Sequence, residues 1–342
     1  MDIYSFLPSE LEEIVAGMGY EPYRARQLFS GLHRGGNPYK FGLPKKLVDE
    51  LLQRYEFRPV EIIRSLKASD GTEKFLFKLS GGNLIEGVLM RYSYGNTLCV
   101  STQVGCAMGC AFCASTIGGM VRHLTAGEIA AEVISVNALR REGEGRSVTN
   151  VVLMGSGEPL HNYDNTVKFL RIVSHELGIN ISLRNISLST CGLADKIYRF
   201  SDENLPVTLS LSLHSPFDEV RRKIMPVAKR YTVAETVEAL KYYFEKTGRR
   251  GIIEYAMIKG VNVSAKDAAE LKRVLRGLNC HINLIMLNEV KESGLFPPGM
   301  AEALRFKRML AAEGLSATIR KSKGAEIEGA CGQLRRRYIE QN

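Results

Sequence analysis

Three cysteines stand close together in the stretch STQVGCAMGCAFCAS, which runs from residue 101 to 115. Cys106, Cys110 and Cys113 follow the spacing C-x-x-x-C-x-x-C, without a fourth cysteine beside them. Three thiolates can hold three irons of a 4Fe-4S cluster, which leaves the fourth iron open to chelate a substrate. A structural zinc site would need a fourth protein ligand from farther along the chain, such as His123. The spacing favours the cluster over zinc.

The other four of the seven cysteines are scattered, which does not resemble a disulfide framework. Cys280 precedes an apolar run and is expected in the core, whereas Cys191 receives no role. Cys331 lies in the glycine-bounded loop EGACGQ. Glycine on both sides predicts a mobile thiol there. Cys99 projects from the polar side of its predicted strand.

The charge balance raises the question of a polyanionic partner. The 342 residues hold 46 Lys and Arg against 37 Asp and Glu, with basic clusters at 221–223, 249–250, 320–324 and 335–337. These clusters fit nucleic acid and equally fit a solvated surface, so charge alone leaves both interpretations open. No apolar run approaches the roughly 20 residues of a membrane span, and the first residues lack the features of a signal peptide. We therefore expect a cytoplasmic protein.

Composition and periodicity divide the chain into four parts. Residues 1–55 predict a small helical domain punctuated by Gly and Pro. Residues 56–94 change to short β-prone runs joined by DG and GG turns, which predicts a hairpin extension or linker. Residues 95–320 alternate β-prone and amphipathic helical stretches, the pattern of βαβ units around a parallel sheet. Residues 321–342 form a loop and a basic tail.

The α/β part contains six predicted strand and helix pairs, too few for a complete eight-unit barrel. We therefore expect an open, partial (βα)6 barrel with its site at the carboxyl ends of the strands. Thr125 with Glu128 and Thr232 with Glu235 match the capping box that starts a helix. The expected strands are 97–103, 150–157, 183–190, 207–214, 251–258 and 281–287.

The strand at 207–214 alternates cleanly between apolar and polar side chains. Successive side chains point to opposite faces of a sheet, so one face is expected to meet helices and the other to face the barrel interior. A closed barrel fills its interior with branched apolar residues, whereas this interior is predicted to hold a polar ligand. The apolar set is Val207, Leu209, Leu211 and Leu213, and the polar set is Thr208, Ser210, Ser212 and His214.

The cysteine spacing after the first strand of a partial barrel resembles the radical S-adenosylmethionine (SAM) superfamily. Further stretches resemble the RNA methyltransferase family RlmN over nearly the whole chain. They are YRARQLF in the helical part, GSGEPL (155–160), LSTCG (188–192), LSLHSP (211–216), INLIMLN (282–288) and ACGQL (330–334). The family usually reads G-M-G-E-P, so Ser156 departs from it.

The resemblance implies where the cofactors bind. One 4Fe-4S cluster per chain would be held by Cys106, Cys110 and Cys113, and SAM would bind at the carboxyl ends of the strands. Two molecules of SAM would be consumed per turnover. The residues that match the SAM site of the family are Gly157, Glu158, Ser189, Ser212, Leu213, His214 and Asn288.

The resemblance also implies a reaction, the methylation of adenine C2 in 23S rRNA and tRNA. Cys331 would be methylated first, and a radical made from a second SAM would remove hydrogen from that methyl group. The resulting methylene radical would add to the adenine ring. Glu86 would then take the ring proton, and Cys99 would attack the sulfur of Cys331 to form a transient disulfide and release the product. The apolar neighbours of Glu86 make a charge unexpected there, which fits a functional role.

The implied partners are RNA, bound in part by residues 1–55, and a low-potential electron donor such as flavodoxin or ferredoxin. No membrane is implied, and we expect a monomer. The sister family Cfr, which methylates C8 of the same ribosomal adenine, typically reads G-E-A where this chain has Glu158 followed by Pro159, which favours C2. A non-catalytic iron–sulfur or zinc protein that binds RNA stays open, as does a radical enzyme that activates a protein partner.

Overall fold

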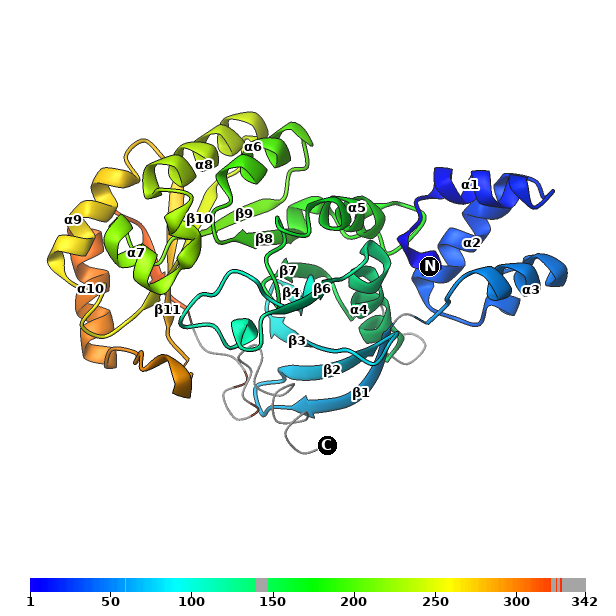
Figure 1. Ribbon diagram of the computed structural model, residues 1–342, viewed down its shortest axis with the longest axis horizontal. Coiled ribbons are helices and arrows are strands. Elements are labelled where there is room, and N and C mark those ends of the chain that lie inside the picture. Colours follow the sequence, from blue (N-terminus) through cyan, green and yellow to red (C-terminus); the bar gives the residue numbers. More distant parts are fainter. Residues whose placement is uncertain (59, 140–146, 289, 321–323, 325–326, 328–342) are drawn as a thin grey trace.

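The computed structural model describes residues 1–58, 60–139, 147–288, 290–320, 324 and 327. Its main feature is a ten-stranded sheet with the order β1-β2-β3-β4-β7-β8-β9-β10-β11-β12. Figure 1 shows that this sheet is curved and does not close on itself. The α/β architecture with a partial barrel, predicted from the alternation of strands and helices, is confirmed.

Parallel pairing runs from β4 through β12. All six predicted strands are present, and β12 adds a short seventh parallel strand. The predicted first strand is too long, because the chain leaves the sheet after Val100. The backbone N–H groups of Thr102 and Gln103 then donate to the carbonyl of Ser156. The strands are β4 (Gly95–Val100), β7 (Asn150–Leu153), β8 (Ile186–Thr190), β9 (Thr208–Ser212), β10 (Gly251–Met257), β11 (Cys280–Met286) and β12 (Ala317–Ile319).

The hairpins before the barrel extend the same sheet. Strands β1 (Val60–Lys67), β2 (Glu73–Leu79) and β3 (Leu84–Tyr92) pair antiparallel in order, and β3 pairs antiparallel with β4. They therefore cover the edge that β4 would otherwise expose. A separate two-stranded sheet, β5 (Gln103–Gly105) and β6 (Met120–His123), flanks the cysteine loop.

Helices pack against the outer face of the parallel strands (Figure 1). The apolar set predicted for residues 207–214 is fully buried in the main core. Both predicted capping boxes are confirmed at the starts of α4 and α8. None of the described helices is long and apolar enough to cross a membrane. The helices are α4 (Ala126–Ala138), α5 (Tyr163–Ser174), α6 (Ala194–Asp202), α7 (Asp218–Ile224), α8 (Val233–Thr247), α9 (Ala265–Val274) and α10 (Met300–Ala312).

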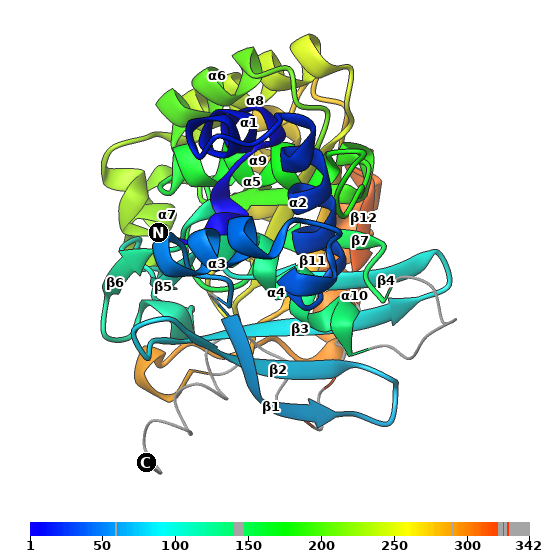
Figure 2. The same ribbon diagram turned by 90° about the vertical axis from the view of Figure 1, so that its right-hand side faces the viewer.

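The amino-terminal helices, α1 (Pro8–Gly17), α2 (Tyr23–Arg34) and α3 (Lys45–Arg54), lie in front of α4 and α5 in the view of Figure 2. The first residues attach them to the barrel at the start of α4. Thr125 Oγ1 donates to the Asp2 carboxylate over 2.7 Å, and Gly127 N donates to Ser5 Oγ over 2.8 Å. Because the first N–H groups of a helix have no partner within it, Asp2 and Ser5 stabilise the amino end of α4.

Gly127→Ala is expected to break this attachment. A Cβ at Gly127 would overlap the Asp2 carboxylate and lie 2.6 Å from the Ser5 nitrogen. We expect a loss of about 2–3 kcal/mol in the free energy of unfolding, measured by urea denaturation. Gly17→Ala is the matched control, because nothing lies within 4 Å of its added Cβ. The control should be neutral or gain up to about 1 kcal/mol. Equal effects of the two substitutions would contradict the attachment.

Candidate functional site

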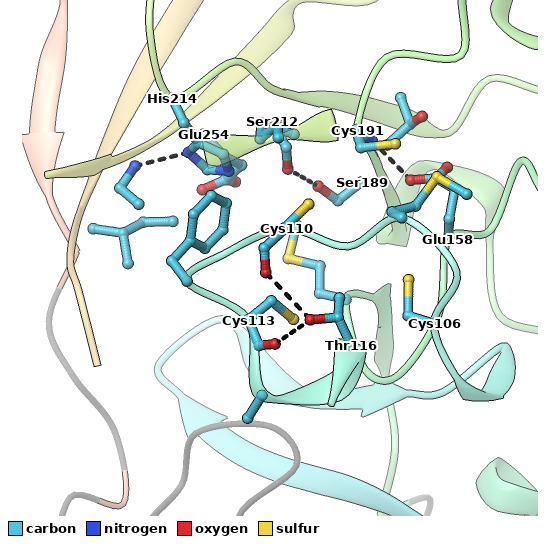
Figure 3. A pocket seen from close by; sticks show the side chains of 18 of the residues that line it. Cys106, Cys110, Cys113, Thr116, Glu158, Ser189, Cys191, Ser212, His214 and Glu254 are labelled. Atoms are coloured by element: carbon cyan, nitrogen blue, oxygen red, sulfur yellow. Dashed lines mark hydrogen bonds between the residues drawn. The ribbon is translucent and has the colours of Figure 1, made fainter. Parts of the chain in front are cut away.

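A cavity of about 320 Å³ opens at the carboxyl ends of the parallel strands. The loop with the three cysteines lines one side, and residues at the ends of β7 to β11 line the other. Figure 3 shows Cys106, Cys110 and Cys113 around the same hollow as Ser189 and Ser212. This is the position expected for the site of a partial barrel.

Hydrogen bonds to the backbone hold the cysteine loop in shape. Thr116 Oγ1, in the 3-10 turn Ala114–Thr116, donates to the carbonyls of Cys110 and Cys113 over 3.2 and 2.8 Å (Figure 3). The N–H of Ala111 donates to the carbonyl of Ile224 over 2.9 Å. The loop is therefore anchored to α7 as well as to itself.

The environment of these thiols suits a cationic metal group. Burial, with a smaller contribution from the nearby Cys113 thiolate, raises the pKa of Cys106 to about 11, although a hydrogen bond from the Met108 backbone opposes the shift. Burial also raises the pKa of Cys110, and the charges of its two partner cysteines add to the shift. Three thiolates would therefore repel one another unless a cation compensated them, and metal binding is what deprotonates such a set.

The grouping fits a cluster better than a single ion. Among the described residues, no three His, Cys, Asp or Glu side chains are grouped closely enough to hold one metal ion. Three cysteines on a cluster each bind a different iron, so they do not have to meet at one point. His123, the candidate fourth zinc ligand, instead contacts Gln103 Nε2 over 3.0 Å and packs against His161.

The loop after β7 is fixed to its neighbours by Glu158. Its carboxylate accepts the N–H of Cys191 over 2.7 Å and that of Leu160 over 3.1 Å. Burial raises the pKa of Glu158, and these bonds oppose that shift. Gly157 has φ +108°, and a Cβ there would lie 2.6 Å from the Gln103 Cβ, so no other residue fits. The tight packing of Gln103 therefore explains this glycine.

Ser156 lies behind the cavity wall. Its N–H donates to Ser101 Oγ over 3.0 Å, and its hydroxyl is 3.5 Å from the carbonyl of Gly105. The side chain is buried and does not line the cavity. The departure from G-M-G-E-P therefore changes the packing beneath the cysteine loop rather than the surface that a ligand would meet.

The opposite wall carries hydroxyl groups and an unusual histidine. Ser189 Oγ and Ser212 Oγ are 3.2 Å apart. His214 has φ +56° and accepts the N–H of Ala256 at Nδ1 over 2.9 Å. Burial, together with the charge of Arg221, lowers the pKa of His214 to about 3. The imidazole is therefore neutral and carries its proton on Nε2, which leaves it a hydrogen-bond donor.

Arg221 corrects part of the interpretation of the basic clusters. It belongs to the cluster at 221–223, yet its side chain is fully buried. Its guanidinium donates to the carbonyls of Cys191 over 2.6 Å and Leu213 over 3.1 Å. Burial lowers the pKa of Arg221. This residue contributes to the ends of β8 and β9 rather than to a surface that could meet a polyanion.

Glu86 and Cys99 lie on the interior face of the sheet, beside the cavity. Cys99 pairs with Val88 across β3 and β4, and Glu86 stands two residues before Val88 on the same face. The Glu86 carboxylate is buried and pairs with the buried Lys74 ammonium over 3.1 Å. Cys99 packs against Met154, which lines the cavity. Glu86 and Cys99 therefore share one face of the sheet, and the hydrophobic cluster that holds Cys99 reaches the cavity lining at Met154.

The remaining candidates are placed differently. Asn288 lines the cavity and is exposed, whereas Leu213 does not line it. The Leu213 side chain lies in the core, and its N–H and carbonyl bond the Glu254 carbonyl and the Arg221 guanidinium. Cys191 lines the cavity, and Cys280 is half-buried against the main core. Cys331 lies outside the described residues. The cavity thus brings together the three loop cysteines with Gly157, Glu158, Ser189, Ser212, His214 and Asn288.

Sequence reasoning missed two charged residues that line the cavity, Glu254 on β10 and Arg320 after β12. A signal for Glu254 was present in GIIEYAMI, because a charge in an apolar strand is as unexpected there as at Glu86. Arg320 carries no such signal, because it begins a basic cluster that reads as surface.

Comparison with known proteins agrees with this geometry. A family model described as Radical SAM superfamily matches residues 100–271, a stretch that contains the cysteine loop and the strands β7 to β10, so the chain belongs to this superfamily. The crystal structure of a radical SAM methyltransferase from Sphaerobacter thermophilus is 43% identical and covers 97% of this chain and 98% of its own, with a TM-score of 0.92.

Curated relatives identify the family of this chain within the superfamily. A protein of Alkaliphilus oremlandii is 46% identical over 99% of both chains, and one of Clostridium perfringens (strain 13) is 46% identical over 99% of this chain and 97% of its own. Both bear the name probable dual-specificity RNA methyltransferase RlmN. The chain belongs to the RlmN family. Membership of the radical SAM superfamily implies a 4Fe-4S cluster and SAM.

The protonation state of His214 gives a test of the site. Its ring should stay neutral, with the proton on Nε2, from about pH 8 to about pH 5, because its pKa is about 3. The measurement is the long-range proton–nitrogen NMR correlation of the apo-protein labelled at histidine. His33 is the matched control, with a pKa lowered to about 4 by burial and Nδ1 donating to the Phe29 carbonyl. Its ring should be neutral with the opposite tautomer.

The same shifts have a defined effect on stability. Below the unfolded pKa of 6.5, the unfolded chain binds a proton at each of these histidines and the folded chain does not. Each imidazole therefore removes about 2 kcal/mol of stability by about pH 5. A His214 signal that titrates near pH 6.5 would contradict the buried geometry.

Proposed function

We propose that this chain is a radical SAM methyltransferase that modifies C2 of an adenine in 23S rRNA and in tRNA. One observation carries the proposal. A cavity with three thiols on one loop adjoins a buried thiol and a buried ion-paired carboxylate on the interior face of the same sheet. The RNA methyltransferase name of the curated relatives supports the substrate class.

Cofactor binding is assigned to the cavity residues. Cys106, Cys110 and Cys113 would hold the cluster, which together with SAM supplies the methyl group and a carbon radical able to abstract hydrogen. His214 would donate from Nε2 to an acceptor of SAM, and the hydroxyls of Ser189 and Ser212 would bond its polar groups. Gly157, Glu158, Leu213 and Asn288 complete the proposed set.

Glu86 is proposed as the group that accepts the ring proton. A carboxyl group can accept a proton only while it is ionised. The Lys74 ammonium at 3.1 Å compensates the charge of the Glu86 carboxylate in a place that water does not reach. The pair therefore supplies a carboxylate on the interior face of β3, beside the thiol of Cys99.

Cys99 and Cys331 are proposed to act in sequence. Cys331 carries the methyl carbon as a thioether until that carbon has bonded to the ring. The ring radical formed by that bond has to lose one electron, which the oxidised cluster would accept, and Glu86 takes the ring proton. The Cys99 thiolate then attacks the Cys331 sulfur, and the bond between that sulfur and the carbon breaks. The electron pair passes to the carbon, which takes up a proton and becomes the methyl group of the product.

RNA binding is proposed for residues 1–55, with residues 56–94 as an extension, 95–320 as the catalytic barrel and 321–342 as the segment that carries Cys331. The net charge of +9 supports a polyanionic partner, although Arg221 contributes nothing to the surface. A flavodoxin or ferredoxin is proposed as the electron donor. The protein is proposed to act as a cytoplasmic monomer.

The product identifies the function. Protein reconstituted anaerobically with iron and sulfide, then given SAM, a reductant and unmodified 23S rRNA fragment or tRNA, should form 2-methyladenosine, measured by mass spectrometry of the digested RNA. Cys106→Ala should lose both the cluster absorbance and the product. 8-Methyladenosine would instead indicate the reaction of Cfr. RNA binding without any methylated nucleoside would indicate a non-catalytic protein.

Replacing Cys99 or Glu86 should trap the enzyme on its substrate. Cys99→Ala removes the attacking sulfur, and Glu86→Gln removes the proton acceptor, so the carbon should stay bonded to both Cys331 and RNA. A denaturing gel with and without nuclease, followed by peptide mass analysis at Cys331, detects the adduct.

Cys280→Ala is the matched control for this experiment, because Cys280 is a half-buried strand cysteine outside the cavity. It should release product as the wild type does. Normal product release by Cys99→Ala would exclude the resolving role.

A further inference from the structure

Glu254 is a buried carboxylate in the wall of the cavity. It stands in the middle of β10, and its side chain is 3% exposed. The pairing register sets it opposite Ser212 on β9 and Asn283 on β11. Figure 3 shows Glu254 beside His214, on the same wall as Ser189 and Ser212. It therefore lies at the level of the hydroxyl groups assigned to ligand binding.

The two carboxylate oxygens of Glu254 differ. Oε1 accepts the amide N–H of Asn283 over 3.1 Å, whereas no described residue donates to Oε2, which is shielded from solvent. Arg320 also lines the cavity and attracts the carboxylate, but the two form no ion pair within 4.0 Å. A buried acceptor without a donor destabilises a fold, so it calls for a reason.

Other buried carboxylates near the site have partners among the described residues. Each oxygen of Glu158 accepts a backbone N–H, and Glu86 is paired with Lys74. Burial raises the pKa of Glu254, with Arg320 and Asn283 opposing the shift. The open oxygen is therefore specific to this position on the wall.

The missing partner must be a donor, because an ionised carboxylate only accepts hydrogen bonds. The cavity is proposed to hold SAM, and the reaction brings in an adenosine of RNA. Both contain adenosine, whose ribose hydroxyls and exocyclic amine are donors. Both sources therefore offer the same chemistry to Oε2.

We propose that Glu254 is a recognition residue for adenosine, whose Oε2 accepts a hydrogen bond from a hydroxyl or amine of the nucleoside while Asn283 fixes the carboxylate. The inference rests on the proposed function for the identity of the ligand. It adds a residue that the motif resemblance did not include. Arg320 holds a positive charge near the carboxylate without occupying Oε2.

The test uses Glu254→Gln in the full-length, cluster-reconstituted protein. Because Asn283 already donates to Oε1, the glutamine oxygen stays there and its amide nitrogen replaces Oε2, which turns an acceptor toward the donors of the nucleoside into another donor. Three quantities are measured: the Kd for SAM, the Kd for the RNA substrate, and 5′-deoxyadenosine released per methylated nucleoside. Glu254→Ala is the second variant, since it removes the acceptor without adding a donor.

The two sources give different results. If SAM supplies the adenosine, its Kd should rise by about tenfold or more while the Kd for RNA is unchanged. If RNA supplies it, the Kd for SAM should be unchanged, and either the Kd for RNA or the ratio of 5′-deoxyadenosine to product should rise by about tenfold. Thermal unfolding of Glu254→Gln should be unchanged or later, because Oε2 has no partner among the described residues.

Ser210→Ala is the matched control. Ser210 is a buried residue on the interior face, two residues before Ser212 on β9. Its hydroxyl also has no partner among the described residues. It does not line the cavity, so its removal should leave all three quantities unchanged.

Three outcomes would overturn the inference. In the first, all quantities stay within about twofold of wild type. In the second, the losses accompany earlier unfolding or a lost cluster, which indicates a structural carboxylate. In the third, Ser210→Ala has the same effect. Failure of the proposed function is distinct, because the wild type would then make no methylated adenosine. An unchanged Kd for SAM in that case would overturn the inference as well.

Discussion

The open end of the barrel depends on one peptide segment that two buried charges hold from opposite sides. The N–H of Cys191, just past β8, donates to the Glu158 carboxylate, and its carbonyl accepts from the Arg221 guanidinium. A peptide group beyond the end of a strand has lost its ladder partner and would otherwise need water. Ionic side chains replace the water there, which fixes the rim of the cavity before any ligand binds.

The polar interior of the barrel determines where its apolar core must lie. The interior carries Ser210, Ser212, Glu254 and Asn283 instead of the branched apolar layers of a closed barrel, so it cannot serve as the main core. The apolar residues lie on the outer face beneath the helices. On the side of β4, the antiparallel hairpins complete the sheet, and the same strands bring the Lys74 and Glu86 pair to the interior face. The extension therefore covers the edge of the sheet and also carries this buried ion pair.

Sequence alone predicts the features that are local. The strands and capping boxes follow from periodicity and from contacts within one helical turn, and the cysteine loop follows from spacing. Features that depend on pairing between distant segments were missed. The register that sets Lys74 beside Glu86 joins two strands, and the burial of Arg221 depends on carbonyls of two other strands. The early end of β4 also has a tertiary cause, because its continuation bonds to the loop after β7. Cys331 itself lies outside the described residues.

Three carboxylates in this half of the protein show that partners, rather than residue type, separate the roles of acidic side chains. Glu158 accepts two backbone N–H groups, which hold the loop after β7 in place. Glu86 is buried and pairs with the Lys74 ammonium, which compensates its charge. Glu254 lines the cavity with a single amide donor on one oxygen and no described partner for the other. A fold stabilised only by its own contacts would supply a hydrogen-bond donor to that oxygen. The position is therefore best explained by a ligand that brings its own donor.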